Sequence, residues 1–358
     1  MNTYKILVIN PGSTSTKIAV FENDKAIYSK NIKHKAEELA PYPKLIDQYP
    51  FRKEIILKEL REANINISSM HAVIGRGGLI KPIPSGVYEV NKDMLEDLKI
   101  GRLGQHASNL GGILADDIVR LIPNAKAFIA DPVVVDELED IARFSGHPKF
   151  ERISIFHALN QKAIARMHAQ AVGKNYEELN LVIAHLGGGI SVGAHKHGKV
   201  IDVNNALDGE GPFSPERAGT LPVKALAELC FSGEYTLDEV KKMITGKGGF
   251  VAYLGTNDAY EVEQKIKNGD TFAAQVHDAM AYQVGKCIAE MSAVLHGNVD
   301  AILLTGGIAY DKDFVDYVKQ MVSFIAPVVI YPGEDEMKAL AENALMVLRG
   351  ETIPKIYQ

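Results

Sequence analysis

Three short turns that contain glycine carry most of the residues in this chain that are suited to chemistry. Each turn follows a run of apolar residues: NPGSTSTK occupies 10–17, HLGGGIS occupies 185–191 and LTGGIAY occupies 304–310. Glycine lets a ligand approach the backbone closely, and the N–H groups of a tight turn can point together at an anion. The three turns therefore favour a ligand that carries phosphate.

The first turn, residues 10–17, adds side-chain donors and a cation to its backbone. Pro11 and Gly12 force the turn, Ser and Thr side chains crowd it with hydroxyl groups, and Lys17 begins the next strand. It is no Walker A loop, because the pattern GxxxxGK[ST] followed by a helix is absent. A polar hairpin tip without a ligand is the alternative. Phosphate binding is predicted for Gly12, Ser13, Ser15 and Lys17.

The second turn, residues 185–191, places three successive glycines after an apolar strand. Such glycines can relieve crowding at a domain interface, but a bound phosphate explains three in succession better. The third turn, residues 304–310, gives a weaker signal, and its Gly-Gly pair would let a flat adenine or ribose lie against the backbone. Nucleotide binding is predicted for Gly187, Gly188, Gly189, Gly306 and Gly307.

The elements that must position these turns alternate between strand and helix. Short apolar runs predict strands at 5–9, 17–21, 26–32, 71–75, 126–131, 180–185, 300–304 and 326–331. Helical spacing predicts helices at 51–64, 107–121, 157–172, 220–231, 236–244, 271–296 and 334–349. Residues 4–32 and 180–203 share one order of apolar strand, glycine turn with serine, strand, short turn and strand. This repeat predicts two related domains, and two unrelated β-hairpins are the alternative.

Composition excludes several classes of protein. A chain of 358 residues with 46% hydrophobic and 23% charged residues has ordinary globular composition and room for two domains. The net charge of −6, without a block of like charges, argues against a nucleic acid as the main partner. The two cysteines, Cys230 and Cys287, are far apart in the sequence, which indicates reduced thiols. With no export signal and no membrane-length apolar run, we expect a cytoplasmic protein without a membrane partner.

In this order and at these separations, the three turns resemble those of the acetate and sugar kinase superfamily, which also contains actin. Within it, nearly the whole chain is similar to the acetokinase family of acyl-phosphate-forming kinases. INPGSTSTK and AHLGGGISVGA resemble the two phosphate motifs of that family, and residues 202–222 resemble a loop that carries an active-site arginine. Residues 75–88, 131–148 and 154–162 are more similar to butyrate kinases than to acetate kinases.

The resemblance implies a kinase whose phosphoryl acceptor is a carboxylic acid. Such an acid, with a pKa of about 4–5, is ionised at neutral pH and needs no general base. It needs relief from charge repulsion, because a carboxylate must approach a polyanionic phosphate. In-line phosphoryl transfer then depends on positioning and on charge stabilisation by Arg, Lys and Mg²⁺.

The resemblance also implies which residues carry out the reaction. Arg76, after a predicted strand, and Arg217, in a Gly/Pro-bounded loop, are similar to two active-site arginines, with surface salt bridges as the alternative. His157 matches a histidine that contacts the transferring phosphoryl group, and His106 and His185 are further matches, the latter near the nucleotide. The implied catalytic residues are Asn10, Arg76, Asp131, His157 and Arg217, of which Asn10 and Asp131 would also position Mg²⁺.

Two departures from the family pattern bear on the metal and on the acid. Acetate kinases have a glutamate in a turn GIGEN, where this chain has Tyr310 followed by Asp311. They also have asparagine in a turn HLGNG, where this chain has Gly188. Both differences favour the butyrate kinases, and the first leaves the Mg²⁺ ligands open.

We therefore predict an α/β fold of two actin-like (ribonuclease H-like) domains, each with a mixed five-stranded sheet flanked by helices, and a cleft between them. The predicted domains are 1–156, with a C-terminal segment 334–358 packed back on it, and 157–333. The predicted reaction is reversible transfer of the γ-phosphoryl of ATP to butyrate or a branched short-chain acid, with Mg²⁺. Acetate or propionate kinase, sugar kinase and a non-catalytic nucleotide-binding protein are the alternatives. A homodimer or higher homo-oligomer is expected from the resemblance.

Overall fold

The computed structural model describes residues 3–358, whose contacts divide the chain into two units. Unit 1 consists of Met1–Val135 and Asp335–Gln358, and unit 2 consists of Asp136–Glu334. Each unit is described by itself. The division thus falls after residue 135, whereas the sequence placed it after residue 156.

Residues 136–156 belong to unit 2 because ion pairs and hydrogen bonds tie them to its sheet. Glu137 accepts from Lys162 Nζ at 2.6 Å and from the backbone N–H of Val200 at 2.9 Å. Arg152 donates to Asp202 Oδ1 at 2.9 Å. This segment has no regular α-helix or strand and depends on long-range contacts, so its local pattern did not indicate which unit it joins.

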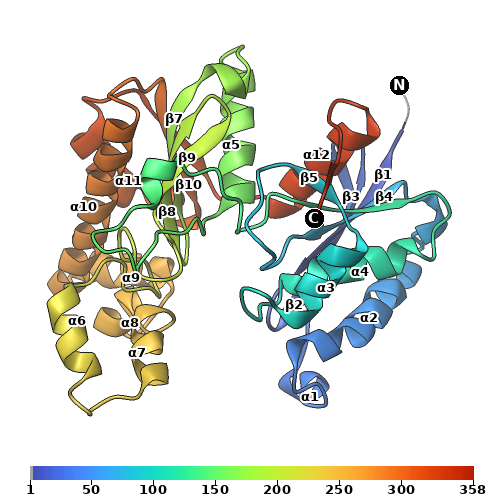
Figure 1. Cartoon of the computed structure of the whole chain (residues 1–358), viewed down its shortest axis with the longest axis horizontal. Helices are drawn as coiled ribbons and strands as arrows, with labels where there is room; N and C mark the ends of the chain where they lie inside the picture. The colour runs from blue at the N-terminus through green and yellow to red at the C-terminus, as the bar shows by residue number, and fades with distance from the viewer. Residues whose placement is uncertain (1–2) are drawn as a thin grey trace. The chain divides into compact units, whose positions relative to one another are not determined.

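Unit 1 is built on a sheet of order β12-β5-β6-β4-β1-β2-β3, with helices on both of its faces (Figure 1). Its strands are β1 (Lys5–Pro11), β2 (Ser15–Glu22), β3 (Lys25–Lys33), β4 (Ala72–Arg76), β5 (Val87–Glu89), β6 (Lys126–Ala130) and β12 (Lys355–Ile356). Its helices are α1 (Ala36–Leu39), α2 (Tyr49–Glu62), α3 (Lys92–Ile100), α4 (Asn109–Val119) and α12 (Glu336–Leu348). Strands β1, β4 and β6 are parallel, while β2 and β3 continue the sheet as antiparallel hairpins.

Unit 2 is built on a sheet of order β11-β10-β7-β8-β9. Its strands are β7 (Asn180–Leu186), β8 (Ile190–Lys196), β9 (Lys199–Val203), β10 (Ala301–Gly306) and β11 (Val328–Pro332). Its helices are α5 (Ala158–Ala171), α6 (Val223–Cys230), α7 (Leu237–Ile244), α8 (Gly249–Leu254), α9 (Ala259–Lys267), α10 (Thr271–Val294) and α11 (Lys312–Val322). In Figure 1, α10 and α11 lie on one face of this sheet and α5 on the other. All residues of β7 are buried, as expected for a strand covered on both faces.

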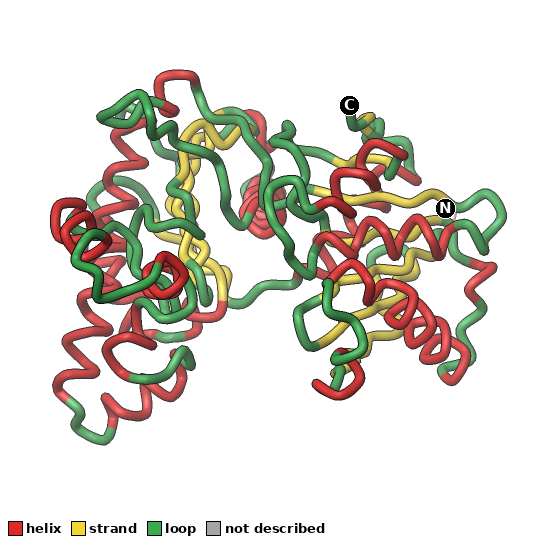
Figure 2. Tube along the Cα trace, turned by 60° about the horizontal axis from the view of Figure 1, so that its bottom comes forward, coloured by secondary structure: helices red, strands yellow, loops and turns green. Residues whose placement is uncertain are grey.

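The repeat predicted from the sequence is present in the topology. The order β3-β2-β1-β4-β6 in unit 1 corresponds to β9-β8-β7-β10-β11 in unit 2, with the same parallel and antiparallel pairings. In Figure 2 the strands of each unit, drawn in yellow, form a layer bordered by helices. The prediction of five strands is correct for unit 2 and wrong for unit 1, whose sheet has seven. The additional strands, β5 and β12, have only three and two residues, too few for a periodic signal.

The closing helix α12 packs on the sheet of unit 1, as the sequence predicted. Its apolar spacing predicts one face, of which Met337, Leu340, Ala341, Ala344 and Leu345 are buried and Leu348 is half-buried. Helices α3, α9 and α11 were not predicted, although each begins at an Asn or Asp whose side chain caps the first turn.

Both cysteines are free thiols, Cys230 exposed and Cys287 buried. Among residues 3–358, no helix combines the length and the apolar character that a membrane crossing requires.

Candidate active site

Three predicted residues of unit 1 lie at one edge of its sheet because they end or follow parallel strands. Ile9 of β1 pairs with Gly75 of β4, so the next residues, Asn10 and Arg76, lie at the carboxyl ends of neighbouring strands. Arg76 in turn pairs with Ala130 of β6, directly before Asp131. The carboxyl ends of parallel strands are where α/β sheets bind ligands.

A cavity of about 540 Å³ opens at this edge of unit 1. The predicted residues that line it are Asn10, Gly12, Ser13, Ser15, Lys17, Arg76 and His106. Leu45 and Ala107 add apolar surface, and neither was singled out from the sequence. The cavity therefore combines a cationic side, a turn rich in hydroxyl groups and an apolar wall.

Glu336 is a candidate residue that the sequence analysis missed. Its Oε2 accepts from Asn10 Nδ2 at 2.6 Å and from Arg76 Nη1 at 2.9 Å. It is the first residue of α12, so only the packing of this C-terminal helix on the sheet brings it to the first turn. The predicted start of a helix near 334 was the only available signal, and it gave no partner.

Arg52 of α2 is a second residue that was not predicted from the sequence. It supports the first turn by binding the backbone of that turn. Its side chain is fully buried, and its guanidinium donates to the carbonyl oxygens of Gly12 (2.7 Å), Ser13 (3.0 Å) and Ser15 (2.9 Å), and twice to Gln48 Oε1 (3.2 and 2.8 Å). Burial lowers the pKa of Arg52 to about 10, so the group stays charged at neutral pH. These acceptors are uncharged, and the guanidinium therefore adds positive charge behind the turn.

Replacing Arg52 by lysine is expected to lower the free energy of unfolding by about 3 kcal/mol and to raise KM for ATP about tenfold. An ammonium group has three donors and cannot match the planar fork that holds the turn. Urea unfolding and steady-state kinetics measure the two effects. Arg120→Lys, at an exposed pair with Asp116, is the matched control. Wild-type values for both quantities in the Arg52→Lys protein would contradict a supporting role for Arg52.

Asp131 holds a turn as well as following β6. Its Oδ1 accepts from Ser85 Oγ at 2.7 Å and from the backbone N–H of Gly86 at 2.8 Å. The residue is buried and adopts a φ of +38°. Asp131 is not among the residues that line the cavity of Asn10 and Arg76. Its metal role stays a prediction.

In unit 2, Arg217 lies directly against the second turn. A Cβ placed on Gly189 would overlap the guanidinium of Arg217, so glycine lets this guanidinium lie directly against the turn. Arg217 Nη1 donates to the carbonyl oxygen of Ala206 at 2.5 Å, and its buried Nε has no hydrogen-bond partner within residues 3–358. Burial lowers the pKa of Arg217, opposed by the charges of Glu216 and Asp208. A buried N–H donor on a cation beside a glycine turn suits an anionic ligand.

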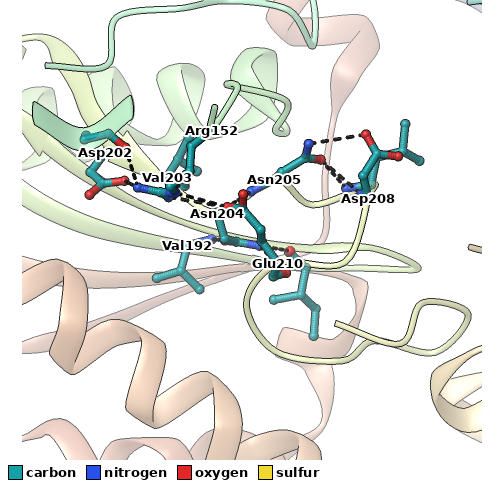
Figure 3. Close-up of polar contacts among 11 residues, drawn as sticks. Arg152, Val192, Asp202, Val203, Asn204, Asn205, Asp208 and Glu210 are labelled. Atoms are coloured by element: carbon teal, nitrogen blue, oxygen red, sulfur yellow. Dashed lines mark hydrogen bonds and ion pairs between the residues drawn. The ribbon is translucent and has the colours of Figure 1, made fainter. Parts of the chain in front are cut away.

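The loop that carries Arg217 is fixed by a network of polar side chains, shown in Figure 3. Arg152 donates to Asp202 Oδ1 at 2.9 Å and to Glu210 Oε2 at 3.4 Å. Glu210 Oε2 also accepts from the backbone of Asn205 at 3.1 Å. Asn204 joins the loop to β8, whose backbone donates to Asn204 Oδ1 at 2.7 Å. The network thus connects the Arg217 loop to two strands of the sheet.

His157 and His185, both predicted, are stacked in unit 2. Their ring centroids are 3.9 Å apart with an angle of 17° between the planes. His157 precedes the first turn of α5, and His185 lies near the end of β7. His185 Nδ1 contacts Asn160 Oδ1 at 2.9 Å, and its Nε2 lies 3.4 Å from Glu334 Oε2. The structure therefore brings together the two histidines from segments that the sequence separates by 28 positions (185 − 157).

In the third turn, the backbone requires glycine at position 306, whereas position 307 has free space around it. Gly306 has a φ of +93°, and a Cβ there would overlap the carbonyl oxygen of Leu186. Gly307 is exposed, and a Cβ there would meet no atom within 4 Å. The neighbouring Asp311 caps α11, and its Oδ2 forms a hydrogen bond of 2.9 Å with His277 Nε2. The Asp311 carboxylate therefore has two structural roles, as a helix cap and as the partner of a buried histidine.

Replacing His277 by glutamine is expected to remove a pH dependence of stability above pH 6.5. Burial alone would lower the pKa of His277, but the hydrogen bond and charge of Asp311, aided by Asp278, raise it. The folded protein thus binds this proton more tightly than the unfolded chain, so the contribution is complete below the unfolded pKa of about 6.5 and is lost as pH rises through the folded pKa. Asp311, whose pKa is lowered overall, stays ionised throughout this range.

Urea midpoints measured from pH 6 to pH 9 test this dependence. His147→Gln, at an exposed histidine, should keep the wild-type slope. An unchanged slope in His277→Gln would assign the dependence to another group.

The sequence is similar to that of a known kinase along its full length. Butyrate kinase 2 of Clostridium acetobutylicum is 59% identical over 355 residues, which cover 99% of this chain and 99% of that protein. The chain belongs to the acetokinase family. The model of that family matches residues 152–326, which include His157, the second turn and Arg217. The chain is therefore an enzyme, a carboxylate kinase of the acetokinase family.

Solved structures show that the fold is also that of acetokinases. The acetate kinase of Porphyromonas gingivalis superimposes with a TM-score of 0.80 at 19% identity, over 96% of this chain and 100% of that one. A propionate kinase from Francisella tularensis gives a TM-score of 0.75 at 18% identity, over 95% and 98% of the two chains. The family and the actin-like fold predicted from the three turns are thus confirmed.

Proposed function

We propose that this acetokinase transfers the γ-phosphoryl group of ATP to butyrate or a branched short-chain acid, giving an acyl phosphate and ADP. The observation that carries the proposal is the guanidinium of Arg217, held against the second turn with a buried N–H that no described group accepts. The 59% identity to a butyrate kinase supports butyrate over acetate or propionate as the acid.

The candidate residues of both units provide the positive charge and the hydrogen-bond donors that this reaction requires. In unit 1, Lys17 and the supporting Arg52 provide positive charge at a turn of hydroxyl and N–H groups. In unit 2, Arg217 and His157 lie near the glycines of the second turn. The acid is already ionised, so these groups serve to hold the carboxylate and the phosphates in line and to offset their repulsion. That both units act on one substrate pair stays a prediction.

The residues present fit Mg²⁺ held in part by the nucleotide. Within the described residues, no cluster of three or more His, Cys, Asp or Glu side chains is arranged to hold a metal. Mg²⁺ needs no such cluster, because it is usually bound by one or two carboxylates together with substrate phosphates and water. Glu336, which contacts two residues that line the cavity, Asn10 and Arg76, offers such a carboxylate. Bound Mg²⁺ would offset the charge of the phosphates.

Replacing Glu336 by glutamine is expected to raise the Mg²⁺ concentration that gives half-maximal activity by about tenfold or more. The amide keeps the shape of the side chain and removes its charge. Titrating activity with Mg²⁺ at saturating ATP measures the effect. Glu342→Gln, on the exposed face of the same helix, is the matched control. A wild-type Mg²⁺ titration together with a changed KM for the acid would contradict a metal role. It would indicate that Glu336 acts only by positioning Arg76.

Acyl phosphate trapped as its hydroxamate tests the reaction and the acid together. The purified chain would be assayed with ATP and Mg²⁺ on acetate, propionate, butyrate, isobutyrate and glucose. We expect the highest kcat/KM for butyrate or isobutyrate, because each methylene that fits an apolar wall contributes about 1–3 kcal/mol. A preference for acetate or propionate would overturn the choice of acid. ATP consumption with glucose and no hydroxamate would favour a sugar kinase. ATP binding without turnover of any substrate would favour a non-catalytic nucleotide-binding protein.

A further inference from the structure

A buried chain of hydrogen bonds leads from His157 into unit 2. His157 Nδ1 contacts Ser191 Oγ at 2.9 Å, and Ser191 Oγ contacts Gln161 Nε2 at 2.8 Å. Gln161 Oε1 contacts His195 Nε2 at 2.8 Å, and His195 Nδ1 contacts the hydroxyl of Tyr176 at 2.6 Å. All of these residues except His157 are buried. None of the other four was singled out as functional from the sequence.

The direction of the chain is fixed at Gln161. One end of its side-chain amide lies 3.0 Å from the backbone carbonyl oxygen of Ser191. A carbonyl oxygen can only accept, so the amide nitrogen must face it, and the amide oxygen must face His195. His195 Nε2 therefore carries a proton and donates it to Gln161 Oε1.

The far end of the chain agrees with this direction. His195 is completely buried, and its burial lowers its pKa well below the usual value, so the ring is neutral. With the proton on Nε2, its Nδ1 is an acceptor, and the hydroxyl of Tyr176 donates to it. Each polar atom of the ring thus has a partner of the correct kind.

The near end determines the state of His157. Among residues 3–358, Ser191 Oγ has three partners: Gln161 Nε2, the backbone N–H of His157 at 3.4 Å, and His157 Nδ1. The first two can only donate, so the single proton of the hydroxyl is directed at Nδ1. In a neutral His157, the ring proton must then reside on Nε2.

We propose that Ser191 and Gln161 are positioning residues that hold neutral His157 with its proton on Nε2, so that this nitrogen is a hydrogen-bond donor. The ring is further restrained by its stack on His185. Under the proposed function, on which this use rests, Nε2–H donates to the transferring phosphoryl group without requiring a charged imidazole. The assignment of the proton itself follows from the hydrogen bonds alone.

Nitrogen NMR of the full chain labelled with [¹⁵N]histidine tests the proton assignment directly. Spectra at pH 8 distinguish protonated from unprotonated ring nitrogens, and loss of signals in His157→Gln assigns the ring. We expect His157 with a protonated Nε2 and an unprotonated, hydrogen-bonded Nδ1, and the same for His195. In Ser191→Ala, His157 should become a mixture of tautomers while His195 keeps its signals. Ser292→Ala, which removes a buried hydroxyl from α10, should change neither ring.

Kinetics test whether the fixed proton matters for phosphoryl transfer. We expect Ser191→Ala to lower kcat about tenfold with little change in KM for ATP, and His157→Ala to lower kcat about 10²-fold. The double variant should be no slower than His157→Ala, because Ser191 acts through the ring that has been removed.

The outcomes separate this inference from the proposed function. A proton on Nδ1 of His157 in the wild-type protein, or a tautomer state unchanged by Ser191→Ala, would overturn the inference whatever the activity. Additive losses in the double variant would also overturn it, because Ser191 would then have an independent role. An active His157→Ala protein with the expected spectra would instead refute the role of His157 in the proposed function, and would leave the proton assignment standing.

Discussion

Replacing Arg217 by glutamine is expected to lower kcat about 10³-fold, the largest effect among the substitutions considered, because a cation that stabilises charge on a transferring phosphoryl group commonly contributes this much. The guanidinium lies against Gly189 and has one buried N–H without a partner among the described residues. Glutamine keeps a polar side chain but has no charge. The loop itself should remain in place, because Arg152, Glu210 and Asn205 hold it independently of residue 217.

Initial rates of hydroxamate formation at saturating ATP and acid measure the loss. Arg120→Gln is the control, since Arg120 is exposed and pairs with Asp116 one helical turn away. Urea unfolding should give a similar free energy for both variants. A decrease in kcat of less than about tenfold for Arg217→Gln would remove Arg217 from the proposed chemistry.

Replacing Gly189 by alanine is expected to lower kcat about 10²-fold although no functional group is removed. The added Cβ would occupy the position of the Arg217 guanidinium, so the side chain must move away from the turn. Misplacement of a catalytic group by about 1 Å is sufficient for a loss of this size.

The double variant Gly189→Ala/Arg217→Gln distinguishes this mechanism from a general distortion of the turn. If the alanine acts by moving Arg217, the double variant should be no slower than Arg217→Gln alone. Gly146→Ala is the matched control, because a Cβ at Gly146 would meet no atom within 4 Å. Full activity of Gly189→Ala would show that the guanidinium tolerates displacement.

In both units, candidate residues lie at the carboxyl ends of corresponding parallel strands. Asn10 and Arg76 lie at the carboxyl ends of β1 and β4 in unit 1, and His185 lies near the carboxyl end of β7 in unit 2, paired with Thr305 of β10. The glycine turn after the first strand of each unit connects to an antiparallel neighbour. The repeat in the sequence therefore corresponds to a repeated candidate ligand-binding edge.

Local pattern in the sequence determined the strands, the turns and the family. Continuous apolar runs such as 180–185 specified strands covered on both faces, and glycine turns after those strands gave the candidate phosphate sites. These features are short in range, so a single sequence displays them. Short strands such as β5 and β12 leave too few residues for a period to be read.

The tertiary structure alone decided which groups support the predicted ones. Arg52 reaches the first turn from α2, Glu336 reaches Asn10 across 326 positions, and Gln161 joins Ser191 across 30. Each of these residues lies within a helix or at its first position, and no local motif marks it. The proposed role of each depends on a partner that is distant in the chain. Hydrogen bonds act over about 3 Å in space with no dependence on sequence separation. The sequence by itself thus predicted candidate phosphate sites, and folding decided which buried groups hold those residues in position.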